Sequence, residues 1–262
     1  MSTINPRTLI AIPVYNEIAT AERVLRRIRS IHPDVLVVDD GSTDGTGDLL
    51  ESLKPELGFE LIRHDPNEGY GKSLIDAFAA AETLGFDWVV TMDCDEQHEP
   101  ESIPAFLQEI EKDEFDLVSG SRYTTEPDAS DPLAAPPPER RKINKLITQE
   151  INERLGLGIT DAFCGFKAHR VERIAELGLT ETGYAFPMQL WVRSAAAGHR
   201  VGEIPVRLIY NDPNRTFGGG LDDAEKRLRH YRELLHHELC TARELLSERA
   251  TEELVVDCGS AA

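Results

Sequence analysis

Short apolar runs alternate with helical patterns along the first half of the chain. Runs rich in β-branched and other apolar residues predict buried strands at residues 9–12, 35–38, 61–62, 88–92 and 117–120, and Pro13 is expected to end the first. Apolar residues at helical spacing predict helices over residues 18–31, 48–53, 73–84 and 103–110. A strand followed by a helix, repeated along the chain, predicts an α/β fold with a mostly parallel central sheet and helices on both faces.

The second half has a less regular pattern. Residues 124–138 hold five prolines and few large apolar residues, which predicts a loop. Beyond it we predict helices over residues 141–155, 186–197 and 222–249, and a strand over residues 201–209. Neither side of the loop looks complete alone. We therefore expect one domain over residues 1–249, built from parts at about 8–123 and 139–249, with a frayed tail at 250–262.

Composition and charge narrow the class of protein. The chain has 262 residues, 40% of them apolar, so it can bury a core without disulfides, and its four scattered cysteines predict reduced thiols. A net charge of −19 excludes general attraction to nucleic acid or anionic lipid, so an anionic ligand needs a local site. The N-terminus lacks an apolar signal core, and no stretch approaches the ~20 apolar residues of a spanning helix. We expect a cytoplasmic protein that can still rest on the cytoplasmic face of a membrane.

The sharpest chemical signal is the stretch from Asp93 to Gln97, which follows a predicted strand. Asp93 and Asp95 then lie at the carboxyl end of that strand, where ligands bind in such sheets. Carboxylate oxygens suit Mg²⁺ or Mn²⁺, which leave room for substrate phosphates. The alternative is a plain acidic turn. The preceding strand, and a second acidic strand end at Asp39-Asp40, favour the metal site.

Two further stretches carry weaker signals. Asp40 in Val38-Asp39-Asp40-Gly41-Ser42 follows a strand and can accept hydrogen bonds from a base or a ribose hydroxyl, but the stretch alone also predicts a tight turn. Gly71-Lys72-Ser73 is not a phosphate-binding P-loop, because the required earlier glycine is Pro66. Gly69, Gly71 and the start of the next helix can still approach a ligand closely.

Taken together, three stretches resemble one family: Ile12 to Glu17, Val38 to Thr46 and Asp93 to His98. They are similar to the inverting family-two glycosyltransferases, which share a Rossmann-like nucleotide-diphospho-sugar transferase fold. Within that family the chain looks most like the dolichyl- or polyprenyl-phosphate sugar (mannose or glucose) synthases. Gly120-Ser121-Arg122 and the segment from Asp161 to Lys167 resemble their later motifs, and the match covers residues 8 to about 210. The part at 8–123 would then bind the nucleotide-sugar, and the part at 139–249 would face the acceptor.

The resemblance also implies roles for single residues. It assigns the nucleoside to Pro13, Tyr15, Glu17, Val38 and Asp40, and the metal to Asp93, Asp95 and Gln97, with Cys94 beside them on the donor through its backbone. It assigns phosphate contacts to Arg122 and Arg141, and closure over the donor to Arg215, because a planar guanidinium binds phosphate oxygens in pairs. Asp95 and Arg122 would carry the catalytic roles.

Two departures from the family pattern bear on the acceptor. Relatives often carry Ser-Lys after the loop arginine, but this chain has Gly218-Gly219-Gly220-Leu221, so Lys226 or Arg227 would have to supply the missing cation. Many relatives that act on sugar hydroxyls place a catalytic Asp near residues 184–191, where this chain has Gln189 and no acid. A hydroxyl acceptor needs a general base, whereas an ionised lipid phosphate does not. The departure favours a phosphate acceptor.

We therefore expect a metal-dependent inverting enzyme that moves a hexose from GDP-mannose or UDP-glucose to polyprenyl or dolichyl phosphate. Nucleic acid is not an expected partner, whereas peripheral membrane contact or an integral-membrane partner is compatible with the chain. The helices at 141–155 and near the C-terminus are the candidates for touching lipid. Two alternatives stay open: a transferase that uses a sugar hydroxyl or small soluble acceptor, and a non-catalytic nucleotide-sugar-binding protein.

Overall fold

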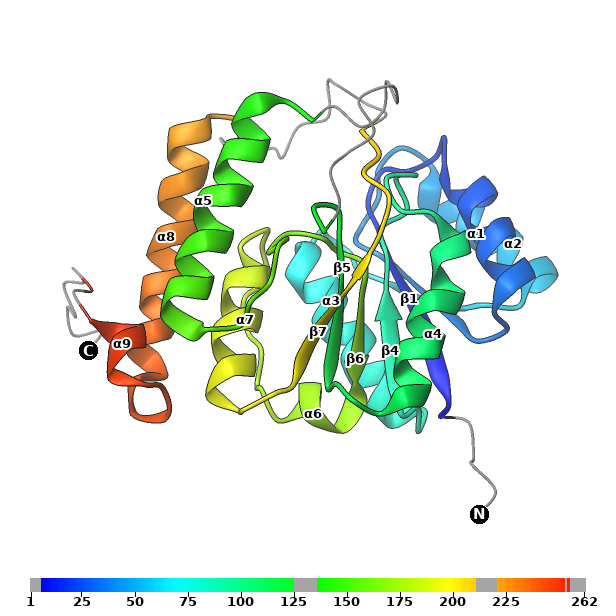
Figure 1. Ribbon diagram of the computed structural model, residues 1–262. Helices are drawn as coiled ribbons and strands as arrows, with labels where there is room; N and C mark the ends of the chain where they lie inside the picture. Colours follow the sequence, from blue (N-terminus) through cyan, green and yellow to red (C-terminus); the bar gives the residue numbers. More distant parts are fainter. Residues whose placement is uncertain (1–5, 125–135, 211–220, 253, 255–262) are drawn as a thin grey trace, which may run out of the picture.

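A seven-stranded sheet runs through the molecule in the order β3-β2-β1-β4-β6-β5-β7 (Figure 1). The computed structural model describes residues 6–124, 136–210, 221–252 and 254. Its strands are β1 (Thr8–Val14), β2 (Val35–Asp39), β3 (Glu60–Arg63), β4 (Trp88–Thr91), β5 (Leu117–Ser121), β6 (Lys167–Arg170) and β7 (Val201–Pro205). Every neighbouring pair is parallel except the two that involve β6, which is antiparallel to β4 and β5. The predicted mostly parallel sheet is confirmed.

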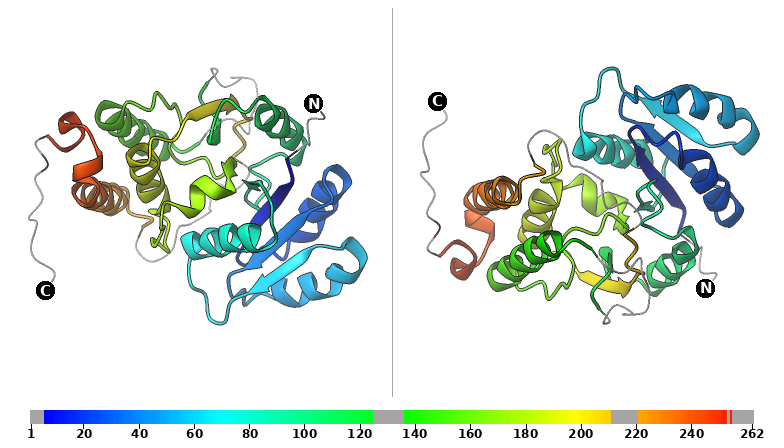
Figure 2. Two further views of the ribbon diagram at one scale, coloured as in Figure 1. Left: turned by 90° about the horizontal axis from the view of Figure 1, so that it is seen from below. Right: turned by 90° about the horizontal axis from the view of Figure 1, so that it is seen from above.

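Helices cover both faces of this sheet (Figures 1 and 2). One face carries α1 (Ala21–Ile31), α2 (Thr46–Leu57) and α4 (Ile103–Lys112), and the other carries α3 (Tyr70–Thr83), α6 (Val171–Ala175) and α7 (Phe186–Ala196). Two further helices, α5 (Pro138–Leu155) and α8 (Ala224–Thr241), pack against α7. Alternate residues of β1 supply both cores: Ile10 and Ile12 pack on one face, Leu9 and Ala11 on the other. Burial on both faces explains why the strands read as continuous apolar runs.

The first strand does not end at Pro13 as predicted, but continues to Val14. The N–H of Ile10 donates to Asp34 O on the β2 side, so by alternation the nitrogen of residue 13 faces β4. Pairing with β4 stops at Ala11, so the missing N–H of Pro13 breaks no ladder bond.

Strand β6 was not predicted, although it lies between β4 and β5. Its sequence, Lys-Ala-His-Arg, shows no apolar alternation, yet Lys167 and His169 are buried. The short helix α6 was also missed. The strand expected over residues 201–209 ends at Pro205, because its partner β5 ends at Ser121.

The single long helix expected from Asp222 to Arg249 was wrong. Helix α8 ends at Thr241, and the chain then forms a 3₁₀ turn (Arg243–Leu245) and the short helix α9 (Glu248–Thr251). Helix α9 packs back on α5, where an Arg154 Nη1 donates to Ala250 O at 3.2 Å. This packing buries Ala250, whereas a straight continuation of α8 would not bring α9 back onto α5.

Most of the predicted loop at 124–138 lies outside the described residues. Within the part of the chain that the structure covers, no helix is both long and apolar enough to cross a bilayer.

Core packing near the site gives a first test. Phe106 of α4 is fully buried and stacks on Phe166, with ring centroids 4.4 Å apart. We expect Phe106→Ala to lower the free energy of unfolding by about 3 to 5 kcal/mol, measured by urea titration, because it leaves a cavity. Leu245→Ala is the control: this side chain is 72% exposed, so its change should stay within about 0.5 kcal/mol. Equal changes in the two variants would contradict this packing.

Candidate active site

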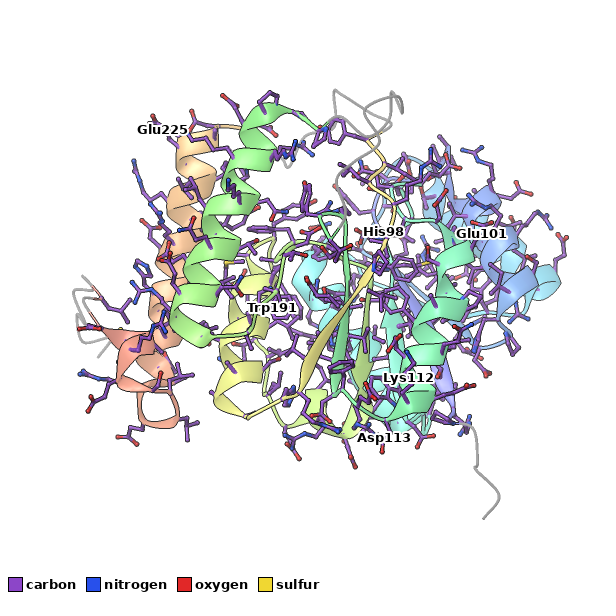
Figure 3. All side chains as sticks on the ribbon, viewed as in Figure 1. His98, Glu101, Lys112, Asp113, Trp191 and Glu225 are labelled. Carbon is purple, nitrogen blue, oxygen red and sulfur yellow. The ribbon has the colours of Figure 1, made fainter. Side chains whose placement is uncertain are left out.

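A cavity of about 420 Å³ opens at the carboxyl edge of the parallel strands. Figure 3 shows that edge near His98, whereas Lys112 and Asp113 mark the opposite end of the sheet. The carboxylates that line the cavity, among the described residues, are Glu17, Asp40, Asp93 and Asp95, which follow β1, β2 and β4. We call these four residues the acidic side. The cations that line it are Arg122, Arg140, Lys167 and Arg227, here called the basic side.

The turn that carries Asp93 and Asp95 is fixed by its neighbours. The N–H of Asp93 donates to His98 Nδ1 at 3.0 Å, and Asp95 Oδ1 accepts from the N–H of Gln97 at 2.9 Å. Glu96 has a left-handed backbone (φ 62°) and accepts two bonds, of 2.6 and 2.7 Å, from the Arg23 guanidinium on α1. No sequence pattern indicated this anchor, because it joins two elements far apart in the chain. The turn is thus held before any ligand binds.

Space around Asp93 is left by a glycine. A Cβ on Gly165 would lie 2.7 Å from Asp93 Oδ2 and 2.8 Å from Tyr70 Oη. The Tyr70 hydroxyl donates to Asp93 Oδ1 at 3.1 Å, and burial together with this carboxylate raises the pKa of Tyr70 well above 10. Tyr70 therefore stays a neutral donor that orients Asp93.

The residues at this turn fit a small divalent cation. Within the described residues, no cluster of three or more His, Cys, Asp or Glu side chains is suited to a metal. Mg²⁺, however, needs few protein carboxylates when substrate phosphates complete its shell. Asp93 and Asp95 supply two. The Gln97 Nε2 is buried without a hydrogen-bond partner, so the protein does not fix this amide, and its oxygen is able to turn towards a cation.

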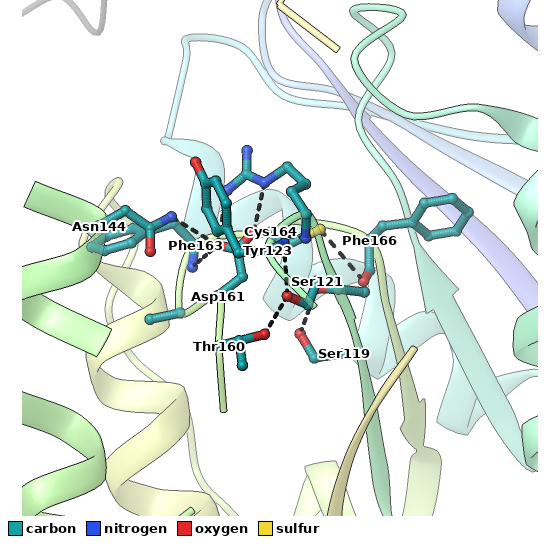
Figure 4. Close-up of polar contacts among 12 residues, drawn as sticks. Ser119, Ser121, Tyr123, Asn144, Thr160, Asp161, Phe163, Cys164 and Phe166 are labelled. Atoms are coloured by element: carbon teal, nitrogen blue, oxygen red, sulfur yellow. Dashed lines mark hydrogen bonds and ion pairs between the residues drawn. The ribbon is translucent and has the colours of Figure 1, made fainter. Parts of the chain in front are cut away.

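Arg122 lines the cavity and is held by the buried carboxylate of Asp161, which Figure 4 shows beside Asn144. Its Nε and Nη2 donate to the two oxygens of Asp161 at 2.6 and 2.9 Å, and Asn144 Nδ2 also donates to Asp161 at 2.8 Å. Burial acts to raise the pKa of Asp161, but the charge of Arg122 outweighs it and holds that pKa well below its usual range. Asp161 therefore stays ionised and fixes the guanidinium. The sequence marked Asp161 only as part of a motif.

The structure distributes the other predicted cations unevenly. Arg140 lines the cavity and lies over the Tyr210 ring at 5.4 Å, whereas Arg141 is exposed and is not among the lining residues. Of the two replacements named for the missing loop cation, Arg227 is buried and lines the cavity, while Lys226 is exposed outside it. Arg215 lies outside the described residues.

The predicted nucleoside residues mostly come together. Pro13, Tyr15, Glu17 and Asp40 line the cavity, as does Cys94, but the side chain of Val38 is buried in the core and leaves only its backbone. Gly69 also lines the cavity, whereas Gly71 packs against the backbone of Glu181.

Gln189, which lies where the family resemblance predicts an acid in transferases that act on sugar hydroxyls, does not face the cavity. Its oxygen accepts from the N–H groups of Thr180 and Glu181 at 2.6 and 2.8 Å, and its nitrogen donates to Glu238 on α8 at 2.6 Å. It has a structural role that ties α7 to α8.

The part of the chain that forms most of this site matches a described protein family. The pattern of Glycosyl transferase family 2 matches residues 9–178. The chain belongs to glycosyl transferase family 2. It is therefore a glycosyltransferase, with the nucleotide-sugar transferase fold that its sequence resembled.

Relatives give the closer context for this glycosyltransferase. It is 32% identical to an undecaprenyl-phosphate mannosyltransferase of Micrococcus luteus over 82% of this chain and 89% of that protein. It is also 32% identical to a polyprenol monophosphomannose synthase of Mycolicibacterium smegmatis, over 78% and 79% of the two chains. A glucosyl-3-phosphoglycerate synthase of Mycobacterium tuberculosis, solved with Mn²⁺, UDP and glucosyl-3-phosphoglycerate, shares the fold (TM-score 0.65, 19% identity, 89% and 80% coverage).

The close fit at Gly165 gives a test of the metal site. We expect Gly165→Ala to weaken Mn²⁺ binding about tenfold or more, because the new methyl group presses on Asp93. The measurement is calorimetric titration of Mn²⁺ in the presence of GDP or UDP. Gly156→Ala is the control: nothing lies within 4 Å of its Cβ, so the change strains only a left-handed turn and should leave Mn²⁺ affinity unchanged. Unchanged affinity in Gly165→Ala would place the metal elsewhere.

Proposed function

We propose that this glycosyltransferase moves a hexose from GDP-mannose or UDP-glucose to a polyprenyl or dolichyl phosphate, with inversion and with a divalent metal. The observation that carries the proposal is the division of the cavity. All four lining carboxylates of the described residues follow β1, β2 or β4, whereas α5, α7 and α8 contribute none, so we infer that no carboxylate serves the acceptor as a general base. The two mannosyl-transferring relatives, whose names specify an undecaprenyl phosphate and a polyprenol, support a lipid phosphate acceptor.

In this proposal the acidic side holds the donor. Asp93, Asp95 and Gln97 bind Mg²⁺ or Mn²⁺, and Pro13, Tyr15, Glu17, Val38, Asp40 and Cys94 surround the nucleotide. The bound metal supplies charge neutralisation for the departing diphosphate. The fold relative solved with Mn²⁺ and UDP supports a metal at such a site.

The basic side then holds the acceptor phosphate. Arg122 is fixed by Asp161 and needs no reorganisation to meet an anion. Arg140 and Arg227 also line the cavity and add positive charge to it. Arg141 and Arg215 keep the roles that the family resemblance assigns them, a phosphate contact and closure over the donor. Apolar side chains of Leu208, Ile209 and Tyr210 continue the wall, as a prenyl chain requires.

The chemistry needs no proton transfer from the acceptor. An oxygen of the ionised acceptor phosphate attacks the anomeric carbon, a new carbon–oxygen bond forms, and the bond to the donor diphosphate breaks on the opposite face. The nucleoside diphosphate leaves with the electron pair. Such an acceptor is already ionised at neutral pH, which agrees with the lack of a carboxylate among the described lining residues of α5, α7 and α8. Because the acceptor is a lipid, we also propose peripheral contact with the cytoplasmic face of a membrane.

Turnover tests the proposal directly. With Mn²⁺, each donor and a short polyprenyl phosphate, we expect metal-dependent release of GDP or UDP and one glycolipid product. Asp95→Asn should lower kcat/KM by about a hundredfold or more, because it removes metal-held charge stabilisation. Glu111→Gln, an exposed acid on α4, is the matched control and should match the wild type. Turnover only with a soluble sugar acceptor, or tight donor binding without any turnover, would favour the two alternative functions instead.

Two neighbouring arginines test the basic side. Arg140→Gln should raise the KM for polyprenyl phosphate about tenfold, because Arg140 lines the cavity, and should change the KM for the donor little. Arg141→Gln is the matched change one residue on, and its exposed side chain predicts a small effect. A larger effect at Arg141 would support the assignment from the family resemblance.

A further inference from the structure

Asp40 is the hub of a buried network at the nucleoside end of the cavity. It is 3% exposed. Its Oδ2 accepts from Asn67 Nδ2 at 2.8 Å and from the N–H of Gly69 at 2.9 Å. Its Oδ1 accepts from the N–H of Glu68 at 2.8 Å and from His64 Nδ1 at 2.7 Å. Asn67 and Gly69 also line the cavity, and the hydrogen bonds to Asp40 hold them in place. The three residues therefore form one wall that faces a ligand.

His64 links this wall to a second carboxylate. The residue follows β3 and is 8% exposed. Its Nδ1 lies 2.7 Å from Asp40 Oδ1, and its Nε2 lies 2.8 Å from Asp76 Oδ2 on α3. Ionised carboxylates only accept hydrogen bonds, so both ring nitrogens must carry a proton. With both carboxylates ionised, this geometry makes His64 an imidazolium.

The charges alternate from the cavity to the surface. Lys72, one turn before Asp76 on α3, donates to both oxygens of Asp76 at 2.6 Å, and Glu68 lies 3.8 Å from the same ammonium. Arg63, next to His64, pairs with Asp39 at 3.3 Å and not with Asp40. His64 is thus the cation that balances Asp40. A buried carboxylate without such a partner is strongly destabilising.

The network joins the three elements that form this end of the cavity: the end of β2, the end of β3 and the start of α3. Packing leaves little room for rearrangement, because a Cβ on Gly41 would lie 2.6 Å from the N atom of Asn67. A change at His64 is therefore passed to Asp40 and to the loop at 64–69.

We propose that His64 is a positioning residue for donor binding: bridging Asp40 and Asp76 as an imidazolium, it holds the nucleoside wall formed by Asp40, Asn67 and Gly69. This role rests on the proposed function, because it takes the nucleoside to lie at Asp40. His64 touches no substrate itself, and it lies outside the turn of Asp93 and Asp95.

The role carries a pH dependence of fixed sign. Burial lowers the pKa of His64, but its bonds to Asp40 and Asp76 outweigh burial, so the pKa lies above its ordinary value of 6.5. The bridge is complete below that raised pKa. As the pH rises through it, the ring keeps one proton and loses one of its two bonds. Donor affinity should therefore fall on the alkaline side and not on the acid side.

Calorimetric binding of GDP and UDP with Mn²⁺, from about pH 6 to about pH 9, tests the proposal. His64→Gln keeps a hydrogen-bond donor but cannot carry a charge. At low pH it should therefore bind GDP and UDP about tenfold more weakly than the wild type, and its affinity should not fall further at alkaline pH. Asp76→Asn removes the carboxylate that accepts a hydrogen bond from His64 Nε2. The pKa of His64 should then fall, and the loss of nucleotide affinity should begin at a lower pH. His237→Gln, an exposed histidine on α8, should retain the wild-type profile.

Nitrogen NMR of the wild-type imidazoles provides a measurement that needs no variant, and it should show both His64 nitrogens protonated at pH 6.5 and somewhat above. A neutral His64 ring at pH 6.5, a His64→Gln variant with wild-type affinity and pH profile, or an Asp76→Asn variant whose affinity begins to fall at the wild-type pH would each overturn the proposal. If the wild type binds neither nucleotide at any pH, the proposed function fails first, and the two failures are thereby distinguished.

Discussion

Charge buried at the carboxyl edge of the sheet is the constraint on which the site depends. A buried ion is tolerated only with a partner, and here the partners come from different elements. Asp161 pairs with Arg122, and His64 lies between Asp40 and Asp76. These pairs fix the walls of the cavity. Asp93 and Asp95 line the same cavity two residues apart; Asp93 accepts from the Tyr70 hydroxyl and Asp95 from the N–H of Gln97, and carboxylate oxygens gathered in this way suit a metal ion.

The same edge is divided into two chemical halves by topology. The parallel strands β1, β2 and β4 end in the residues that lead to the acidic side. The antiparallel strand β6 then enters between β4 and β5, and it brings Gly165 and Lys167 beside Asp93. An in-line displacement needs its leaving and attacking groups on opposite sides of one carbon atom. The cavity supplies groups for both: its carboxylates follow β1, β2 and β4, and its guanidinium groups come from the end of β5, from α5 and from α8.

Because the overall charge is −19, the few cations that line the cavity indicate where an anionic ligand can bind. Most arginines on the described surface are paired with carboxylates, as Arg26 is with Glu56. An anionic acceptor is therefore not drawn by the protein as a whole. In the proposed function it is recognised by the few guanidinium groups that line the cavity, Arg122 among them.

The sequence by itself determined the repeated strand and helix pattern, the acidic strand ends and the family, because apolar periodicity and short motifs are local properties. It also placed Asp40, Asp93 and Asp95 at one edge, since parallel strands end together. Tertiary structure alone decided that Lys-Ala-His-Arg forms a central strand and that Arg140, not Arg141, lines the cavity. It also decided that Gln189 donates a hydrogen bond to Glu238 of α8. It also decided that His64 bridges two carboxylates. Each of these depends on contacts between residues distant in the chain, and no local pattern encodes which side chain finds which partner.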